Sequence, residues 1–449
     1  MMCRRNSPLL RLSLMLFVIA TPILVAWSAA LYADISVQNP QESVLPLKPH
    51  RKISFETDEG TWLSLDVSPD GKTIVFELLG DIYTLDIDGG IAKPLLTGTA
   101  FDSQPVFSPD GAKLAFISDR DGSENLWVAD VDGSNPKRLS MGTGMQRFTS
   151  PAWSSDGLNV YVSRRDIVLY GVPYLWRYHL NGGGGIQITG TGVEARGQMV
   201  LGVAPSVDGK HLYYSISHTS DMRNASVAKI EQLDMNTGTK ERLINALGGA
   251  FRPAVSPNGR WLAYASRPES ETEIRLRDLQ TGEDKRLIYP IDWNLREGAF
   301  TRDMVPGYSF TPDSKSVVMP YGGKIHQVDI TTGKASVIPF SAQVDLDIGP
   351  NLRLTQKDKT GPVRARVIEE PRLSPDGNTL VFTAFGKLYV MPAAGGTAKR
   401  LTATPFGKDG ATENQPDWSP DGRWITYASW SAEGGHIWKV RTNGKNRSK

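Results

Sequence analysis

The stretch Ser68-Pro69-Asp70-Gly71 decides the fold because it recurs along the chain. The other copies and variants are Ser108-Pro109-Asp110-Gly111, Ser154-Ser155-Asp156-Gly157, Ser206-Val207-Asp208-Gly209, Ser256-Pro257-Asn258-Gly259, Thr311-Pro312-Asp313-Ser314, Ser374-Pro375-Asp376-Gly377 and Ser419-Pro420-Asp421-Gly422. A repeat of about 40–50 residues is typical of propellers and solenoids. The sequence therefore predicts eight copies of one structural unit.

The turn motif predicts the strands around it. Proline fixes φ at the first central position of a type I turn, and glycine takes the left-handed position of a three-residue hairpin loop. In the second unit, strands are expected at 104–107, 113–116, 125–130 and near 137–139. Four antiparallel strands make one propeller blade. The predicted fold class is an all-β propeller of about eight four-stranded blades, with seven as the alternative if the sixth unit, which has Ser314 in place of the turn glycine, is degenerate.

The two ends of the repeat region suggest how the ring closes. The last unit has no convincing fourth strand after Val440, and residues 51–57 have no partner within their own blade. An unpaired strand edge is a liability that native proteins usually cover. We therefore expect residues 51–57 to supply the outer strand of the eighth blade and to close the ring.

The N-terminal region predicts export. Arg4, Arg5 and Arg11 precede an uncharged stretch from Leu12 to Ala33 that contains the small-residue run 28–30. This pattern is typical of a signal peptide, although the apolar stretch is long enough for an uncleaved membrane anchor, and both interpretations stay open. The predicted organisation is a signal or anchor at 1–33, a linker at 34–50 and a propeller at 51–449, in a periplasmic or secreted protein.

Composition restricts the class of partner. Lys and Arg number 50 and Asp and Glu number 48, which argues against binding nucleic acid or anionic lipid through bulk charge. The only cysteine is Cys3, within the predicted targeting segment, so the exported part has no disulfide and no cysteine metal site. We expect a membrane contact only through residues 1–33, and only if they are not cleaved.

At these residues the repeat resembles that of the TolB-like propellers. The shared pattern is the Ser-Pro-Asp-Gly turn, an apolar strand, a strand such as Asn125-Leu126-Trp127-Val128-Ala129-Asp130, and Arg400-Leu401-Thr402. That family includes the periplasmic component of the Tol system and the propellers of tricorn-type proteases. Residues 59–62, 101–105 and 361–366 more narrowly resemble exported proteins in which such a propeller precedes a metal-dependent amidohydrolase domain. The resemblance covers residues 51 to about 440 and implies the fold more strongly than any activity.

No catalytic, metal or cofactor motif accompanies the repeats. The six histidines form no His-x-His or His-Glu-x-x-His pair, and there is no Gly-x-Ser-x-Gly elbow. The run Gly190-Thr191-Gly192-Val193-Glu194-Ala195 formally matches a dinucleotide fingerprint, but it lies between blades with no helix to receive a phosphate. The sequence therefore predicts a protein without catalytic residues, metal or cofactor.

Strand alternation places the long loops on one face. Loops between strands one and two and between strands three and four emerge on a tight-turn face. The other loops emerge on a long-loop face, with insertions expected at 163–174, 215–229, 289–307, 340–371 and 404–416. Such loops on a rigid scaffold commonly carry binding residues. The candidates, chosen because Arg, Tyr and Trp are frequent in binding hot spots, are Arg164, Arg165, Tyr170, Tyr174, Arg223, Trp293, Arg296, Arg302, Phe406 and Lys408.

Two functions fit these observations. The first is a non-catalytic propeller that binds a protein or peptide partner or another ligand. The second is a propeller that docks substrate for an amidohydrolase or peptidase whose catalytic domain is absent from this chain. For Trp293 and Phe406 the residues also allow a purely structural role, in which each side chain fixes its own loop to the propeller.

Overall fold

The computed structural model describes residues 49–166, 171–190, 197–218, 228–293, 302–349, 360–405 and 410–449. Within these ranges every regular element is a β-strand, which confirms the all-β prediction. No described helix is both long and apolar enough to cross a membrane. The chain divides into two units, 1–352 and 353–449, where a single propeller over residues 51–449 was expected.

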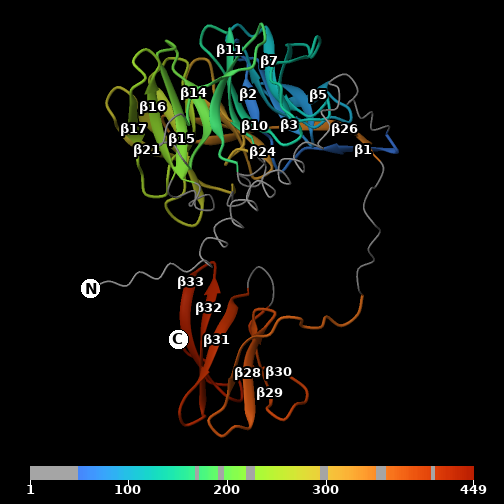
Figure 1. Ribbon diagram of the computed structural model, residues 1–449, viewed down its shortest axis with the longest axis vertical. Coiled ribbons are helices and arrows are strands. Elements are labelled where there is room, and N and C mark those ends of the chain that lie inside the picture. Colours follow the sequence, from blue (N-terminus) through green and yellow to red (C-terminus); the bar gives the residue numbers. More distant parts are fainter. Residues whose placement is uncertain are drawn as a thin grey trace, which may run out of the picture. The chain divides into compact units, whose positions relative to one another are not determined.

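Unit 1 contains six blades, numbered in chain order (Figure 1). Blade 1 contains β2 (Leu65–Val67), β3 (Thr73–Leu78), β4 (Asp81–Asp86) and β5 (Gly90–Leu96). Blade 2 contains β6 (Asp102–Phe107), β7 (Lys113–Ser118), β8 (Asn125–Asp130) and β9 (Lys137–Arg138). Blade 3 contains β10 (Arg147–Trp153), β11 (Asn159–Arg165), β12 (Tyr174–His179) and β13 (Ile186–Gln187).

The other blades of unit 1 follow the same order. Blade 4 contains β14 (Gln198–Pro205), β15 (His211–His218), β16 (Lys229–Asp234) and β17 (Lys240–Ile244). Blade 5 contains β18 (Phe251–Val255), β19 (Trp261–Ser266), β20 (Thr272–Asp278) and β21 (Asp284–Ile291). Blade 6 contains β22 (Ser309–Phe310), β23 (Ser316–Tyr321), β24 (Lys324–Asp329) and β25 (Ala335–Ile338).

Unit 2 contains two further blades. Blade 7 contains β27 (Glu369–Leu373), β28 (Thr379–Ala384), β29 (Lys387–Pro392) and β30 (Lys399–Arg400). Blade 8 contains β31 (Thr412–Trp418), β32 (Trp424–Ser431) and β33 (Gly434–Arg441). In all eight blades the consecutive strands pair in chain order, so the eight predicted repeats give eight sheets.

The repeated turn forms as its residue types require. In blade 1, Ser68 Oγ donates to Asp70 Oδ1 over 2.7 Å, and the backbone N–H of Thr73 donates to Ser68 Oγ over 2.9 Å. The turn of blade 6 makes the same contact between Thr311 and Asp313, and Ser314 takes the left-handed conformation at φ 59°. The sixth unit is therefore a complete blade despite the missing glycine.

Unit 1 closes on itself after six blades. Val318 and Ile325 of blade 6 share one buried core with Leu65 and Ile74 of blade 1. At the turns, a methyl group placed on Gly71 would lie 3.3 Å from the ring of Pro312. Blade 6 is thus the neighbour of blade 1, so the ring has six blades.

The prediction for the N-terminal strand was therefore wrong in its location. The strand β1 (Arg51–Thr57) pairs antiparallel with β26 (Phe340–Ile348), and β26 pairs parallel with β5, so both extend the sheet of blade 1 (Figure 1). Because the ring closes after blade 6, the strand that leaves blade 6 reaches the outer edge of blade 1, where β1 joins it. Part of the expected 340–371 insertion is therefore a strand.

Replacing Ile325 with Ala should destabilise unit 1 by about 2–5 kcal/mol, because the side chain is fully buried where blade 6 meets blade 1. The control is Val337→Ala, which truncates a half-exposed side chain of the same blade and should cost about 0.5 kcal/mol or less. Urea unfolding followed by tryptophan fluorescence measures both. Equal effects of the two substitutions would contradict the closure of blade 6 on blade 1.

Candidate functional site

Bulges in the innermost strands direct polar groups toward the centre of unit 1. The ladder register shifts within β6, β10 and β18, where Gln104, Ser150 and Arg252 have φ of 54°, 58° and 53°. Each of the three precedes a proline. A bulge leaves one residue out of the ladder and redirects its side chain. The bulges therefore provide three polar residues on the inner side of the ring.

A segment of the chain passes through this centre and binds those residues. Asp303 accepts hydrogen bonds from Ser150 Oγ of blade 3 and from the Arg252 guanidinium of blade 5. Gly307 N–H donates to Ser64 Oγ at the entry to blade 1 over 2.7 Å. The segment 302–308, which leads into blade 6, therefore spans the ring from blade 3 to blade 1.

Glu77 of β3 joins the same network. Its Oε2 accepts the backbone N–H of Gln104 over 2.8 Å, and its Oε1 accepts a hydrogen bond from Arg302 Nη1 over 3.0 Å. Gln104 Oε1 in turn accepts the backbone N–H of Ser150 over 2.8 Å. The carboxylates of Glu77 and Asp303 are thus held between the inner strands of different blades.

Burial shifts the acidity of this region. Desolvation raises the pKa of Glu77 to about 7, against the opposing charge of Arg302. Desolvation also raises the pKa of Glu124 to about 7 and that of Asp66 to about 6, against the hydrogen bonds that each carboxylate accepts. Unit 1 therefore holds buried acidic groups that gain or lose protons close to neutral pH.

A cavity of about 210 Å³ lies beside Glu77. It is lined by Thr61, Trp62, Glu77, Leu78, Leu79, Gly80, Phe101 and Arg302. The Arg302 guanidinium lies 4.9 Å from the ring centroid of Phe101 and 5.6 Å from that of Trp62. Because the β3–β4 loop and the blade-to-blade connections line it, the cavity opens on the long-loop face.

Of the predicted residues on blade 3, none reaches this cavity. Arg164 Nε lies 2.7 Å from Asp166 Oδ1, and its guanidinium stacks 4.2 Å from the Trp176 ring centroid. Arg165 is buried, and desolvation lowers its pKa against the attraction of a nearby acidic group. Tyr174 packs against the glycine at 190, where an added methyl group would lie 2.2 Å from its ring.

Trp293 and Arg302 flank the same connection but differ in role. Trp293 is buried in the core of unit 1 and stacks on Tyr308 at a centroid distance of 6.1 Å. Its backbone oxygen accepts a hydrogen bond from Thr272 Oγ1 over 2.6 Å. The structural role considered for Trp293 is therefore the one that the structure supports, whereas Arg302 lines the cavity. The remaining candidates, Tyr170, Arg223, Arg296, Phe406 and Lys408, lie outside the described residues.

The sequence contains only weak indications of the cavity and network residues that the prediction missed. Trp62 and Phe101 lie in motifs noted only for their family resemblance, and Glu77 is the single charge in the apolar strand 73–78. Asp303 had no signal, because its position depends on how its segment enters the ring. Among the described residues, no three His, Cys, Asp or Glu side chains lie close enough together to hold a metal ion.

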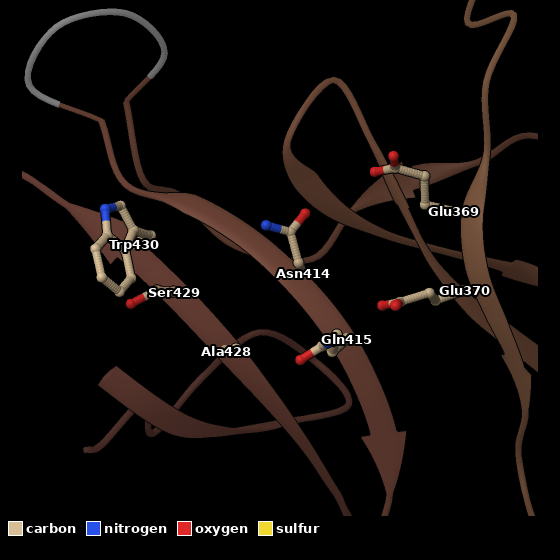
Figure 2. A pocket seen from close by; sticks show the side chains of 7 residues that line it. All are labelled: Glu369, Glu370, Asn414, Gln415, Ala428, Ser429 and Trp430. Atoms are coloured by element: carbon tan, nitrogen blue, oxygen red, sulfur yellow. The ribbon is translucent and has the colours of Figure 1, made fainter. Parts of the chain in front are cut away.

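A second cavity, of about 710 Å³, lies in unit 2. Figure 2 shows Glu369 and Glu370 on β27 facing the strand that bears Asn414 and Gln415, with Trp430 on the next strand. Glu370 and Gln415 have φ of 50° and 56°, as do the equivalent bulge residues of unit 1. Unit 2 therefore repeats the inner-strand geometry of unit 1.

These features define the class of the protein as a β-propeller with a polar centre and a cavity on one face. Residues 63–224 match the family model of the tricorn protease N-terminal beta propeller domain. Within this segment the repeat is therefore similar to that of the tricorn-type propellers, which the resemblance named.

Three proteins are similar to parts of this chain. An uncharacterized protein of Agrobacterium fabrum is 36% identical over 100 residues, which are 21% of this chain and 34% of that protein. Tricorn protease homolog 1 of Streptomyces coelicolor is 35% identical over 89 residues, 20% of this chain and 8% of that protein. The solved structure of a putative TolB from Agrobacterium tumefaciens is 19% identical, covering 53% of this chain and 88% of that one at a TM-score of 0.43. The chain spans about a third or less of the length of the curated relatives it matches.

Substituting Glu77 with Gln should change how stability depends on pH. Because the pKa of Glu77 rises from 4.5 to about 7 on folding, the folded state holds a proton that the unfolded state has lost within that range. The free energy of unfolding of the native protein should therefore fall by up to about 3 kcal/mol from pH 4 to pH 8 relative to Glu77→Gln.

Urea unfolding at pH 4 and pH 8 measures this difference, with Glu241→Gln, at an exposed position of blade 4, as the control. The control should keep the native pH dependence. A Glu77→Gln protein with the native pH dependence would show that Glu77 ionises as it does in water.

Proposed function

We propose that this chain is an exported binding propeller that captures a peptide or protein segment at the long-loop face of unit 1 and performs no chemistry itself. The observation that carries this proposal is the cavity in which Arg302 lies between Trp62 and Phe101. Trp and Arg are enriched among the residues that dominate binding energy. Loops held by a rigid sheet scaffold commonly present such residues.

The geometry of Arg302 leaves part of its guanidinium for a partner. One nitrogen, Nη1, pairs with Glu77, and the side chain remains 29% exposed at the cavity. The half-exposed side chains of Phe101 and Leu79 provide apolar surface beside the guanidinium. The site therefore suits a hydrogen-bond acceptor, such as a carbonyl or carboxylate oxygen, next to an apolar side chain.

The size of the cavity favours a polypeptide over a small molecule. Pockets for drug-sized ligands usually measure about 300–1,000 Å³, and this one is about 210 Å³. A single side chain of an extended segment fits such a volume, while the rest of the segment lies on the surrounding loops. The proposed ligand is therefore one anchoring residue of a larger partner.

The buried acids support binding more than catalysis. Glu77 accepts hydrogen bonds from Arg302 and from the backbone of Gln104, and Asp303 accepts them from Ser150 and Arg252. A general base has to reach the proton of its substrate, and these carboxylates are almost fully buried. Their arrangement suits a rigid frame that positions Arg302.

A second candidate function is docking of substrate for a peptidase or another hydrolase. This candidate is favoured by the similarity to tricorn protease homolog 1. The matched segment makes up 8% of the length of that protein. In that case the same cavity would receive a segment of the substrate, and the chemistry would come from a separate catalytic domain. Hydrolysis of a captured peptide only when such a domain is added would favour this second candidate.

Replacing Phe101 or Arg302 with Ala should weaken peptide capture at least tenfold. The probe is a set of fluorescein-labelled peptides selected on the immobilised full chain from a phage-displayed random dodecapeptide library, with affinity measured by fluorescence anisotropy. Loss of a hot-spot residue typically costs about 2 kcal/mol or more, which exceeds a factor of ten in affinity. Phe101→Ala is the cleaner variant because Arg302→Ala leaves Glu77 buried without its ion pair.

The matched control is Arg260→Ala on the tight-turn face. Like Arg302, Arg260 pairs with a buried carboxylate, that of Asp278, and stacks on an aromatic ring, that of Trp261. Its removal should leave peptide affinity within twofold. Failure to select any peptide, or equal losses in Arg260→Ala and Phe101→Ala, would refute binding at the long-loop face.

Export is proposed on the pattern of residues 1–33. Expression of the full chain in a Gram-negative host, followed by N-terminal mass spectrometry of the periplasmic fraction, should find a chain that starts at Leu31 or Asp34. An intact chain in the membrane fraction would identify the segment as an anchor. An intact chain in the cytosol would refute export.

A further inference from the structure

The blades of unit 1 show that every blade has two packing faces. In blade 2, Leu114 and Phe116 pack with Val75 and Ile82 of blade 1, which defines a preceding face. In the same blade, Ala115, Ile117 and Leu126 pack with Val160 and Val162 of blade 3, which defines a following face. Alternation along the strand therefore places each apolar residue toward one neighbour or the other.

Unit 2 contains only one such interface. Val381 and Leu388 on the following face of blade 7 share a core with Ile425 and Tyr427 on the preceding face of blade 8. Among the described residues of unit 2, nothing covers the preceding face of blade 7 or the following face of blade 8. The unit therefore ends in two uncovered faces of opposite kind.

The exposed fractions of equivalent side chains in the two units show how much apolar surface unit 2 leaves uncovered. Leu373 precedes the turn serine of blade 7 as Phe107 does in blade 2, and it is 54% exposed where Phe107 is 7% exposed. Ile437 stands as far from Ser419 as Leu126 stands from Ser108, and it is 68% exposed where Leu126 is fully buried. Trp430 lies beside it on the same face and is also exposed.

The inner strands of unit 2 lack partners in the same way. In unit 1, the side chain of the bulge residue Gln104 accepts the backbone N–H of Ser150. The side chains of the bulge residues Ser150 and Arg252 both donate to Asp303. Within the described residues, the side chains of Glu370 and Gln415, which hold the equivalent places, make no hydrogen bond. They face the cavity of unit 2 (Figure 2).

We propose that the uncovered faces of unit 2 pair with unit 2 of another copy of this chain. The following face of blade 8 and the preceding face of blade 7 are the two halves of one blade-to-blade interface, and each copy carries both. Within unit 1 itself, blade 6 covers blade 1, so the described ring leaves no blade face of this kind uncovered. This contact is heterologous, because it joins two different surfaces of the same chain. Copies joined by a heterologous contact form a closed ring when the rotation from one copy to the next is a whole fraction of a full turn.

The same repeat fixes the expected number of copies. Unit 1 shows that these blades close a ring of six. A unit of two blades then occupies a third of a turn, so three copies complete a six-bladed ring with the bulge residues of all three on its inner side. The assembly is a trimer held by unit 2, and it is independent of what the cavity of unit 1 binds.

Light scattering after size exclusion of the full chain tests the trimer. The native chain should elute with the mass of three chains, and Trp430→Lys and Leu373→Lys should each weaken association at least tenfold. The control is Leu247→Lys, which places the same charge on an exposed position of unit 1 and should leave the trimer intact.

Mixing the two variants separates loss of the interface from misfolding. The Trp430→Lys chain keeps its blade 7 face, and the Leu373→Lys chain keeps its blade 8 face. Together they should therefore form a dimer through one intact interface, although each alone is a monomer. A monomeric native chain at high concentration, a native dimer, an assembly that survives both substitutions, or no dimer on mixing would each overturn the proposal.

Discussion

The contact between successive turns sets the spacing of the blades, and the rest of unit 1 depends on it. A methyl group placed on Gly111 would lie 3.5 Å from the ring of Pro69, the turn proline of the preceding blade. Gly71 meets Pro312 in the same way at 3.3 Å, and in blade 6 the hydroxyl of Ser314 accepts the backbone N–H of Asn258 over 3.1 Å. Because the turn residue has a positive φ and usually no side chain, each turn approaches its neighbour closely. The series of contacts returns to its start after six blades.

A ring of six has a narrow centre, and this explains the polar network. Asp303 reaches both blade 3 and blade 5, so one segment of chain is enough to span the centre. Buried charges require partners, and the inner-strand bulges supply them at Ser150 and Arg252. The network holds the segment that begins at Arg302, so the position of that guanidinium depends on the interior of the ring as much as on its own loop.

The sequence predicted what is local and missed what depends on distant packing. The turns, the four-stranded repeat and the long-loop face follow from short motifs, and the structure contains all eight sheets. The number of blades in the closed ring depends on packing between residues far apart, such as Ile74 and Val318, and no motif encodes it. The predicted insertion at 340–371 contains the strand 340–348, whose buried Phe340, Ala342 and Val344 alternate with more exposed residues. For the candidate site, position on a long loop selected Arg302, which lines the cavity, and equally selected Trp293, whose aromatic ring is buried.

The central claim is that blade 6, and not blade 8, is the neighbour of blade 1. The residue directly after the turn motif is Lys72 in blade 1, Lys315 in blade 6 and Arg423 in blade 8. Cysteines at these positions therefore report which turns lie next to each other. With Cys3 replaced by Ser, the direct measurement is intramolecular cross-linking by a short bismaleimide of the pair Lys72→Cys with Lys315→Cys, compared with the pair Lys72→Cys with Arg423→Cys. Closure at six blades predicts efficient cross-linking of the first pair. Cross-linking of the second pair with none of the first would contradict it and restore a single ring of eight.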